Sequence, residues 1–174
     1  MKLSFGSGEK RSPGFVHLDG QPYPGIDIVH VWSPSNPVPL PDGSVDEVLL
    51  ALDVLEHFSR HTAPELVKEW SRLCAPGCVL ILTTIEIHRM MSWLREIPGE
   101  ELDVIEGLYC RQNFAGNWHL WCYSRASLRD LLQRYGFVVE KFQEAPLYRG
   151  NVICYARRGP NGWQNFDADV AAQR

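Results

Sequence analysis

The stretch Leu3-Ser4-Phe5-Gly6-Ser7-Gly8 is a short apolar run that leads into a Gly-x-Gly turn, and it decides the fold class of this chain. Glycines at such a turn permit positive φ angles and let the backbone approach a ligand closely. A second apolar run, residues 15–19, ends at Asp19. A carboxylate at that position can accept hydrogen bonds from both ribose hydroxyls of a nucleoside. The two features together predict an α/β fold with a nucleoside site near its N-terminus.

The turn does not match the dinucleotide-binding fingerprint. Arg11 occupies the position of the third glycine, and Asp19 follows Gly8 sooner than the roughly 20-residue offset of that motif. No Gly-Lys-Ser/Thr sequence follows, so a P-loop is not expected either. A plain tight turn followed by an exposed aspartate remains the alternative to a nucleoside site.

Short apolar runs alternate with helical patterns along the rest of the chain, as is typical of an α/β sheet. We expect one helix that begins at Thr62 and another that begins at Ser124, since both residues suit an N-cap. The segment 32–44 is rich in proline and is expected to be irregular. Strands are expected at residues 2–5, 15–19, 27–31, 45–52, 78–84, 137–142 and 151–156, the last two as an antiparallel pair.

The first connections are too short for helices. Nine residues separate Phe5 from Phe15, and seven separate Asp19 from Asp27. A crossover that contains a helix needs roughly 10–12 residues. We therefore expect one face of the sheet to lack its helices, and exposed apolar sheet surface is unfavourable. Either another subunit or the chain's own insertion should cover this face, most simply through a homodimer.

The domain organisation follows from chain length and pattern. A chain of 174 residues fits one domain, expected over residues 1–158, with a flexible tail over 159–174. The segment 86–121 lies between the fifth strand and the last helix, and it is long, aromatic and partly helical. Ligands bind at the carboxyl edge of such sheets, so this insertion is expected to cap the site.

Composition excludes several classes of protein. A net charge of −4 disfavours nonspecific nucleic-acid binding. No apolar run reaches the roughly 18 residues that span a bilayer, and the N-terminus lacks a signal-peptide core. Five scattered cysteines indicate reduced thiols in a cytoplasmic protein. His57 and His61 have a spacing seen in zinc sites, but no third ligand completes the set, so no metal is expected.

Several short motifs follow the glycine turn in a fixed order, and together they resemble class I S-adenosylmethionine-dependent methyltransferases of the type 11 group. The similarity is to a compact subgroup that starts directly at the glycine loop, and it extends to about Arg158. The matching motifs are Gly6-Ser7-Gly8, Asp19, Leu40-Pro41-Asp42-Gly43-Ser44-Val45-Asp46, Val54-Leu55-Glu56-His57, Cys74-Ala75-Pro76-Gly77 and Tyr135-Gly136-Phe137.

This resemblance implies a Rossmann-like sheet that is mostly parallel, with an antiparallel C-terminal strand and a reduced helix layer on one face. It also implies binding of S-adenosylmethionine, with Asp19 on the ribose, Trp32 near the adenine, and Leu52 and Asp53 at the amino-acid end. Val31 stands where relatives often have an acid, and Asp53 where they often have a neutral residue. The residues assigned to the cofactor are Phe5, Gly6, Ser7, Gly8, Asp19, Trp32, Leu52, Asp53 and His57.

The implied activity is in-line methyl transfer to a small molecule or a glycan-type acceptor. The protein then orients the acceptor and, in some cases, removes its proton. His119, within the insertion, is the candidate base, although it could equally pack within an aromatic cluster. The candidate residues on the acceptor side are His88, Tyr109, Trp118 and Trp121. The alternative hypotheses are a non-catalytic relative that serves as a binding or assembly module, and a different nucleotide-binding α/β protein.

Overall fold

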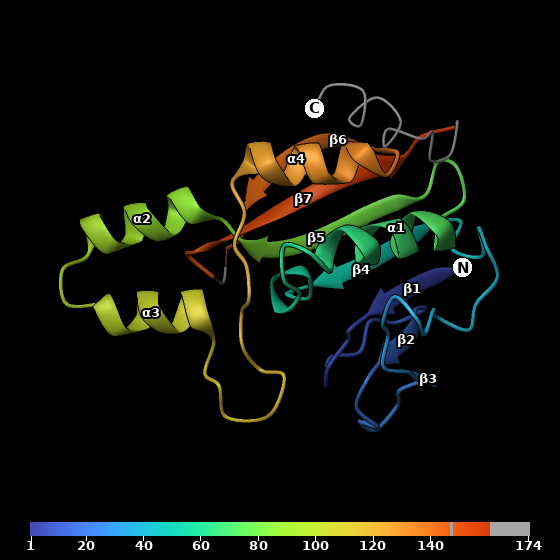
Figure 1. Cartoon of the computed structure of the whole chain (residues 1–174), viewed down its shortest axis with the longest axis horizontal. Helices are drawn as coiled ribbons and strands as arrows, with labels where there is room; N and C mark the ends of the chain where they lie inside the picture. Colours follow the sequence, from blue (N-terminus) through green and yellow to red (C-terminus); the bar gives the residue numbers. More distant parts are fainter. Residues whose placement is uncertain (147, 161–174) are drawn as a thin grey trace.

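The computed structural model describes residues 1–146 and 148–160, and its centre is a seven-stranded sheet with the order β3-β2-β1-β4-β5-β7-β6 (Figure 1). All neighbouring strands pair in parallel except β7, which runs antiparallel to both β5 and β6. The strands are β1 (Lys2–Phe5), β2 (Val16–Asp19), β3 (Ile28–Val29), β4 (Val48–Leu52), β5 (Val79–Ile85), β6 (Phe137–Glu144) and β7 (Asn151–Arg158). The predicted fold class is confirmed.

The helices are α1 (Ala63–Leu73), α2 (Ile87–Glu96), α3 (Glu101–Tyr109) and α4 (Arg125–Arg134), with a short 3-10 helix η1 (Leu55–His57) after β4. Ser124 caps α4 as predicted, because its hydroxyl accepts from the Ser127 backbone N–H. Thr62 occupies the N-cap of α1, but its side chain makes no capping hydrogen bond. Instead the Ser59 hydroxyl accepts from the Thr62 backbone N–H.

Two strands are each three residues shorter than the sequence predicts, and β2 begins one residue later than expected, at Val16. Val45 forms only an isolated bridge with Cys74, so β4 begins at Val48 rather than at residue 45. β3 has two residues instead of the expected five, since only Leu18 and Asp19 of β2 pair with it. Both strands were located correctly, and their ends were set by where a partner strand is available.

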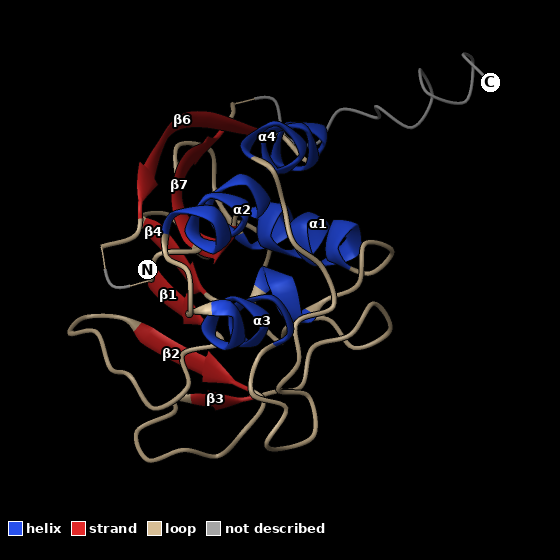
Figure 2. Cartoon of the chain, turned by 90° about the vertical axis from the view of Figure 1, so that its left-hand side faces the viewer, coloured by secondary structure: helices blue, strands red, loops and turns tan. Residues whose placement is uncertain are grey.

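The helices α1 and α4 pack on one face of the sheet, and no described helix packs on the other face (Figure 2). Trp70 of α1 is fully buried and packs edge-on against Phe5 of β1, with ring centroids 5.8 Å apart. The predicted loss of one helix layer is therefore confirmed. The α2–α3 pair extends beyond the carboxyl edge of the strands, so the chain's own insertion does not cover the helix-free face (Figure 1).

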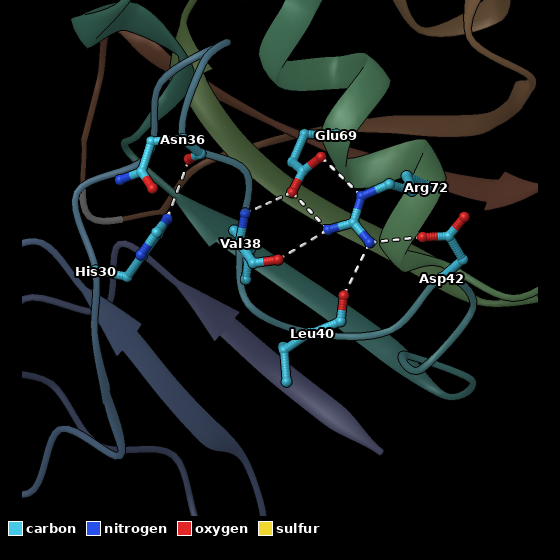
Figure 3. Close-up of polar contacts among 7 residues, drawn as sticks. All are labelled: His30, Asn36, Val38, Leu40, Asp42, Glu69 and Arg72. Carbon is cyan, nitrogen blue, oxygen red and sulfur yellow. Dashed lines mark hydrogen bonds and ion pairs between the residues drawn. The ribbon is translucent and has the colours of Figure 1, made fainter.

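The proline-rich segment is held against α1 by Arg72, which is partly buried and forms ion pairs with the buried Glu69 and with the exposed Asp42. The Arg72 guanidinium pairs with both carboxylate oxygens of Glu69, and it also donates to the Val38 and Leu40 carbonyls (Figure 3). Glu69 in turn accepts from the Val38 backbone N–H at 2.8 Å. A segment without helix or strand has no ladder partners, so these side chains satisfy its backbone groups.

We predict that Arg72→Met lowers the free energy of unfolding by about 1.5–3 kcal/mol, because the buried Glu69 carboxylate loses its charge-assisted hydrogen bonds to the guanidinium. Urea unfolding monitored by circular dichroism measures this change. Arg95→Met is the matched control, since Arg95 is exposed and makes only a 3.4 Å contact with the Ser92 hydroxyl. Equal stability of the two variants would show that the network does not stabilise the fold.

Candidate functional site

The glycine turn after β1 is built by backbone conformation and a tight contact. Gly6 and Gly8 have φ angles of 63° and 56°. A Cβ atom on Gly6 would lie 2.7 Å from Cγ2 of Val54, so a larger residue cannot fit there without displacing the start of η1. A Cβ atom on Gly8 would meet nothing within 4 Å. The turn therefore rests on η1 at Gly6 and faces open space at Gly8.

Asp19 lies directly against this turn, as the sequence predicts. One carboxylate oxygen, Oδ2, accepts from the Gly8 backbone N–H at 2.8 Å, and Oδ1 accepts from the Gln21 backbone N–H at 2.8 Å. Each oxygen keeps a further lone pair for an additional donor. The Ser7 hydroxyl, in the same turn, is buried and has no hydrogen-bond partner within the described residues. These groups fit a ligand that carries adjacent hydroxyl donors.

Asp53 directly follows β4, and its side chain connects three strands. Its backbone has a φ of 55°, an unusual value for a residue other than glycine. The carboxylate Oδ1 accepts from the Thr83 hydroxyl and from the Asn151 side-chain amide, both at 2.7 Å. The Asp53 carboxylate therefore has a structural role, because it joins the ends of β4, β5 and β7.

Glu56 is completely buried beneath the site. Its Oε2 accepts from the Thr84 hydroxyl at 3.0 Å, whereas Oε1 has no partner within the described residues. Burial, with the nearby Asp53 charge, raises the pKa of the Glu56 carboxyl to about 8. The Glu56 carbonyl also accepts from the backbone N–H groups of Leu120 and Trp121. Glu56 thus fixes the end of the insertion to η1.

His57 and His119 come together although they are far apart in sequence. Their rings pack edge-on, with centroids 4.9 Å apart. Nδ1 of His57 contacts the Trp118 carbonyl at 3.1 Å, and Nδ1 of His119 contacts the Gly107 carbonyl at 2.9 Å. A carbonyl can only accept, so each Nδ1 donates its proton there, and Nε2 keeps a lone pair whenever the ring is neutral. Burial, opposed by the Gly107 hydrogen bond, lowers the pKa of His119.

The remaining predicted residues are not all near the turn. Trp32 is buried and packs edge-on against Phe58. Leu52 is exposed at the end of β4, and Tyr109, Trp118 and Trp121 are exposed on the insertion.

His88 lies apart from the turn, in a cavity of about 640 Å³ between α2, the start of α4 and the β6–β7 hairpin. A second cavity, of about 330 Å³, includes Trp32 but none of the turn residues. The described residues contain no group of three side chains that could bind a metal ion.

Sequence reasoning missed the partners that hold the site together. Thr83 and Asn151 orient Asp53, and the Asn151 position is 98 residues away along the chain. Tyr123 is also buried, and burial, with a smaller effect from the Glu56 charge, raises the pKa of the Tyr123 hydroxyl. No local motif marks these residues, because Thr83 reaches Asp53 only through the pairing of β4 with β5, and Asn151 only through the pairing of β5 with β7.

The strand order and the turn define a class of protein: the chain has the Rossmann-like fold of class I methyltransferases. A methyltransferase of Methanosarcina mazei that depends on S-adenosylmethionine matches it with a TM-score of 0.61 at 15% identity, over 91% of this chain and 92% of that one. The 1,6-didemethyltoxoflavin-N1-methyltransferase of Burkholderia thailandensis, solved with S-adenosylhomocysteine, matches with a TM-score of 0.62 at 12% identity, over 91% and 70% of the two chains.

The fold alone does not decide the reaction. The [4+2]-cyclase SpnF is also similar, with a TM-score of 0.59 at 12% identity, over 91% of this chain and 74% of that one. No protein-family model matches the sequence, and no curated protein matches it. The function must therefore be argued from the site.

We predict that Glu56 makes the fold less stable at alkaline pH. Its pKa rises from 4.5 in the unfolded chain to about 8 on folding, so the folded state holds a proton that the unfolded chain has released. The stability from this group is complete below pH 4.5 and is lost as the pH rises through about 8. Urea unfolding from pH 5 to 9 should show a slope of up to about −1.4 kcal/mol per pH unit.

Glu56→Gln should remove this contribution, while Glu9→Gln, on the exposed turn, should keep it. Parallel pH profiles for Glu56→Gln and the wild type would contradict the assignment.

Proposed function

We propose that this protein is a methyltransferase that uses S-adenosylmethionine. The observation that carries the proposal is the Asp19 carboxylate held against the Gly6–Gly8 turn, with a lone pair left on each oxygen. Diol recognition by a carboxylate beside a glycine turn is how nucleosides are bound in sheets of this kind. The similarity to methyltransferase structures supports the proposal at the level of the fold.

The residues present fit this cofactor. The Gly6–Gly8 turn would lie along its methionine part, Asp19 would accept from its ribose hydroxyls, and the buried Ser7 hydroxyl supplies a polar atom that lacks a partner. Leu52 would contribute apolar contact, and Trp32 would lie near the adenine. When bound, the cofactor supplies an activated methyl group on a cationic sulfonium. The protein then orients the acceptor and manages its proton.

His119 is proposed as the general base. Its Nδ1 proton is engaged by the Gly107 carbonyl, so Nε2 is the atom that can accept a proton from an acceptor hydroxyl or amine. Its lowered pKa keeps the ring unprotonated, and so available to accept a proton, down to a lower pH than for an ordinary histidine. His57 packs against this ring and contacts the Trp118 carbonyl, so it would position His119 and would lie beneath the cofactor.

The proposed acceptor is a small molecule or a glycan. Trp118 and Trp121 flank His119 in sequence and are 41% and 42% exposed, although their backbone is fixed by His57 and Glu56. Ordered aromatic rings at the surface offer a stacking platform for a sugar face or a flat ring. Tyr109 adds a further exposed aromatic ring on α3, and His88 would contact a longer acceptor from α2.

We place the protein in the cytoplasm. All five cysteines are unpaired, which suits a reducing compartment. Among the described residues, none of the helices combines the length and apolar character needed to cross a membrane.

We predict that Asp19→Ala weakens S-adenosylmethionine binding by about 10- to 150-fold, since a charge-assisted hydrogen bond contributes about 1.5–3 kcal/mol. Isothermal titration calorimetry measures the affinity. Asp130→Ala on the exposed side of α4 is the control and should bind as the wild type does. Absence of binding by the wild type at millimolar ligand would end the enzyme proposal.

We predict that His119→Gln lowers methyl transfer by about 10²- to 10⁴-fold and leaves cofactor affinity unchanged. The assay follows radiolabelled methyl groups from S-adenosylmethionine into a panel of saccharides and hydroxylated small molecules. Loss of the acidic limb of the pH–rate profile in the variant would identify His119 as the base. Cofactor binding by the wild type without transfer to any acceptor would favour the alternative, a non-catalytic binding module.

A further inference from the structure

The helix-free face of the sheet carries an apolar stripe at its centre. Leu49 of β4 and Leu80 of β5 are fully buried beneath the helices. Because side chains alternate along a strand, the residues next to Leu49 and Leu80 in each strand point to the opposite face. The same alternation in β7 directs Tyr155 to that face. The stripe consists of Val48, Leu50, Val79, Ile81, Ile153 and Tyr155.

The residues of the stripe lie side by side in register. Leu50 is aligned with Ile81, and Ile81 is aligned with Tyr155, so one row of large side chains crosses three strands. Val48 and Val79 form a second row. All six side chains are only half-buried, although they lie on the central strands of the sheet. Central strands of such sheets are normally covered on both faces, so the stripe lacks a covering layer among the described residues.

The charges beside the stripe indicate what covers it. On the β1–β4 side, the Lys2 ammonium lies 3.6 Å from the Glu47 carboxylate. On the β7–β6 side, Arg157 pairs with Glu140 at 2.7 Å. Each flank thus carries charges of both signs, since the Met1 ammonium also pairs with Asp46 on the first, and the Lys141 ammonium lies over the Tyr155 ring on the second. A nucleic acid or an anionic membrane requires a clearly positive surface, which these paired charges do not provide.

We propose that a second copy of this chain covers the stripe, forming a homodimer in which the two helix-free faces pack together. A surface with an apolar centre and mixed charges on both flanks is complementary to itself under two-fold symmetry, since the cation of one flank can meet the carboxylate of the other. It also has the apolar core and polar rim typical of stable interfaces. The dimer is independent of the proposed function, because the stripe lies on the face of the strands, away from the Gly6–Gly8 turn.

A rival interface exists on the insertion. Nine of the fourteen large apolar side chains that are exposed in the described part of the chain belong to residues 91–121. Leu102, at 77%, is the most exposed of them. A self-association experiment must therefore distinguish the stripe from the α2–α3 surface.

The test is light scattering on the full chain from about 1 to 100 µM, with matched apolar-to-lysine substitutions on the two surfaces. The wild type should have about twice the chain mass of 19.8 kDa. Ile81→Lys, in the centre of the stripe, should halve that mass while the circular dichroism spectrum stays native. Leu102→Lys on α3 should leave the dimer intact.

Carbodiimide crosslinking of mixed ¹⁴N and ¹⁵N wild-type chains gives a readout that needs no substitution. It should join Lys2 or Lys141 of one copy to Glu47 or Glu140 of the other. A monomeric wild type at 100 µM would overturn the proposal, as would a dimer that Leu102→Lys disrupts and Ile81→Lys does not.

Discussion

The close approach of the Gly6 backbone to Val54 is the constraint on which the site depends. It is possible only because position 6 has no side chain, and it brings the turn after β1 against the segment that follows β4. The parallel pairing of β1 with both β2 and β4 then sets Asp19 on one side of the turn and Asp53 on the other. The proposed nucleoside site would therefore follow from backbone packing, to which side chains add specificity.

The insertion is attached to this edge through η1 rather than through the sheet alone. The Glu56 carbonyl receives two backbone N–H groups of the segment 120–121, and the His57 ring holds the Trp118 carbonyl. Two adjacent residues of the Leu-Glu-His motif thus fix the chain on both sides of His119. The buried neutral carboxyl of Glu56 costs less free energy than a buried carboxylate would, which explains how an acid is accommodated at the base of the site.

The short connections after β1 and β2 have a consequence for the whole molecule. A sheet with helices on one face only has a second face that water reaches, and here that face is aliphatic at its centre. The core between the sheet and α1 with α4 is nevertheless complete, with Trp70, Leu49, Leu80 and Leu132 fully buried. The core that stabilises the fold therefore forms with one helix layer, although the described residues supply no helices to the other face of the sheet.

The sequence by itself determined the order and type of the elements, since apolar periodicity and turn residues are local properties. It identified the Gly6–Gly8 turn, the position of Asp19, the cap at Ser124 and the missing helix layer. It located the short β3 and the start of β4 only roughly, because strand ends depend on partner strands. Only the tertiary structure decided that His57 meets His119, that Asn151 orients Asp53 and that His88 lies apart from the turn. These contacts join residues that are distant along the chain, and no local pattern encodes which distant partner a side chain will reach.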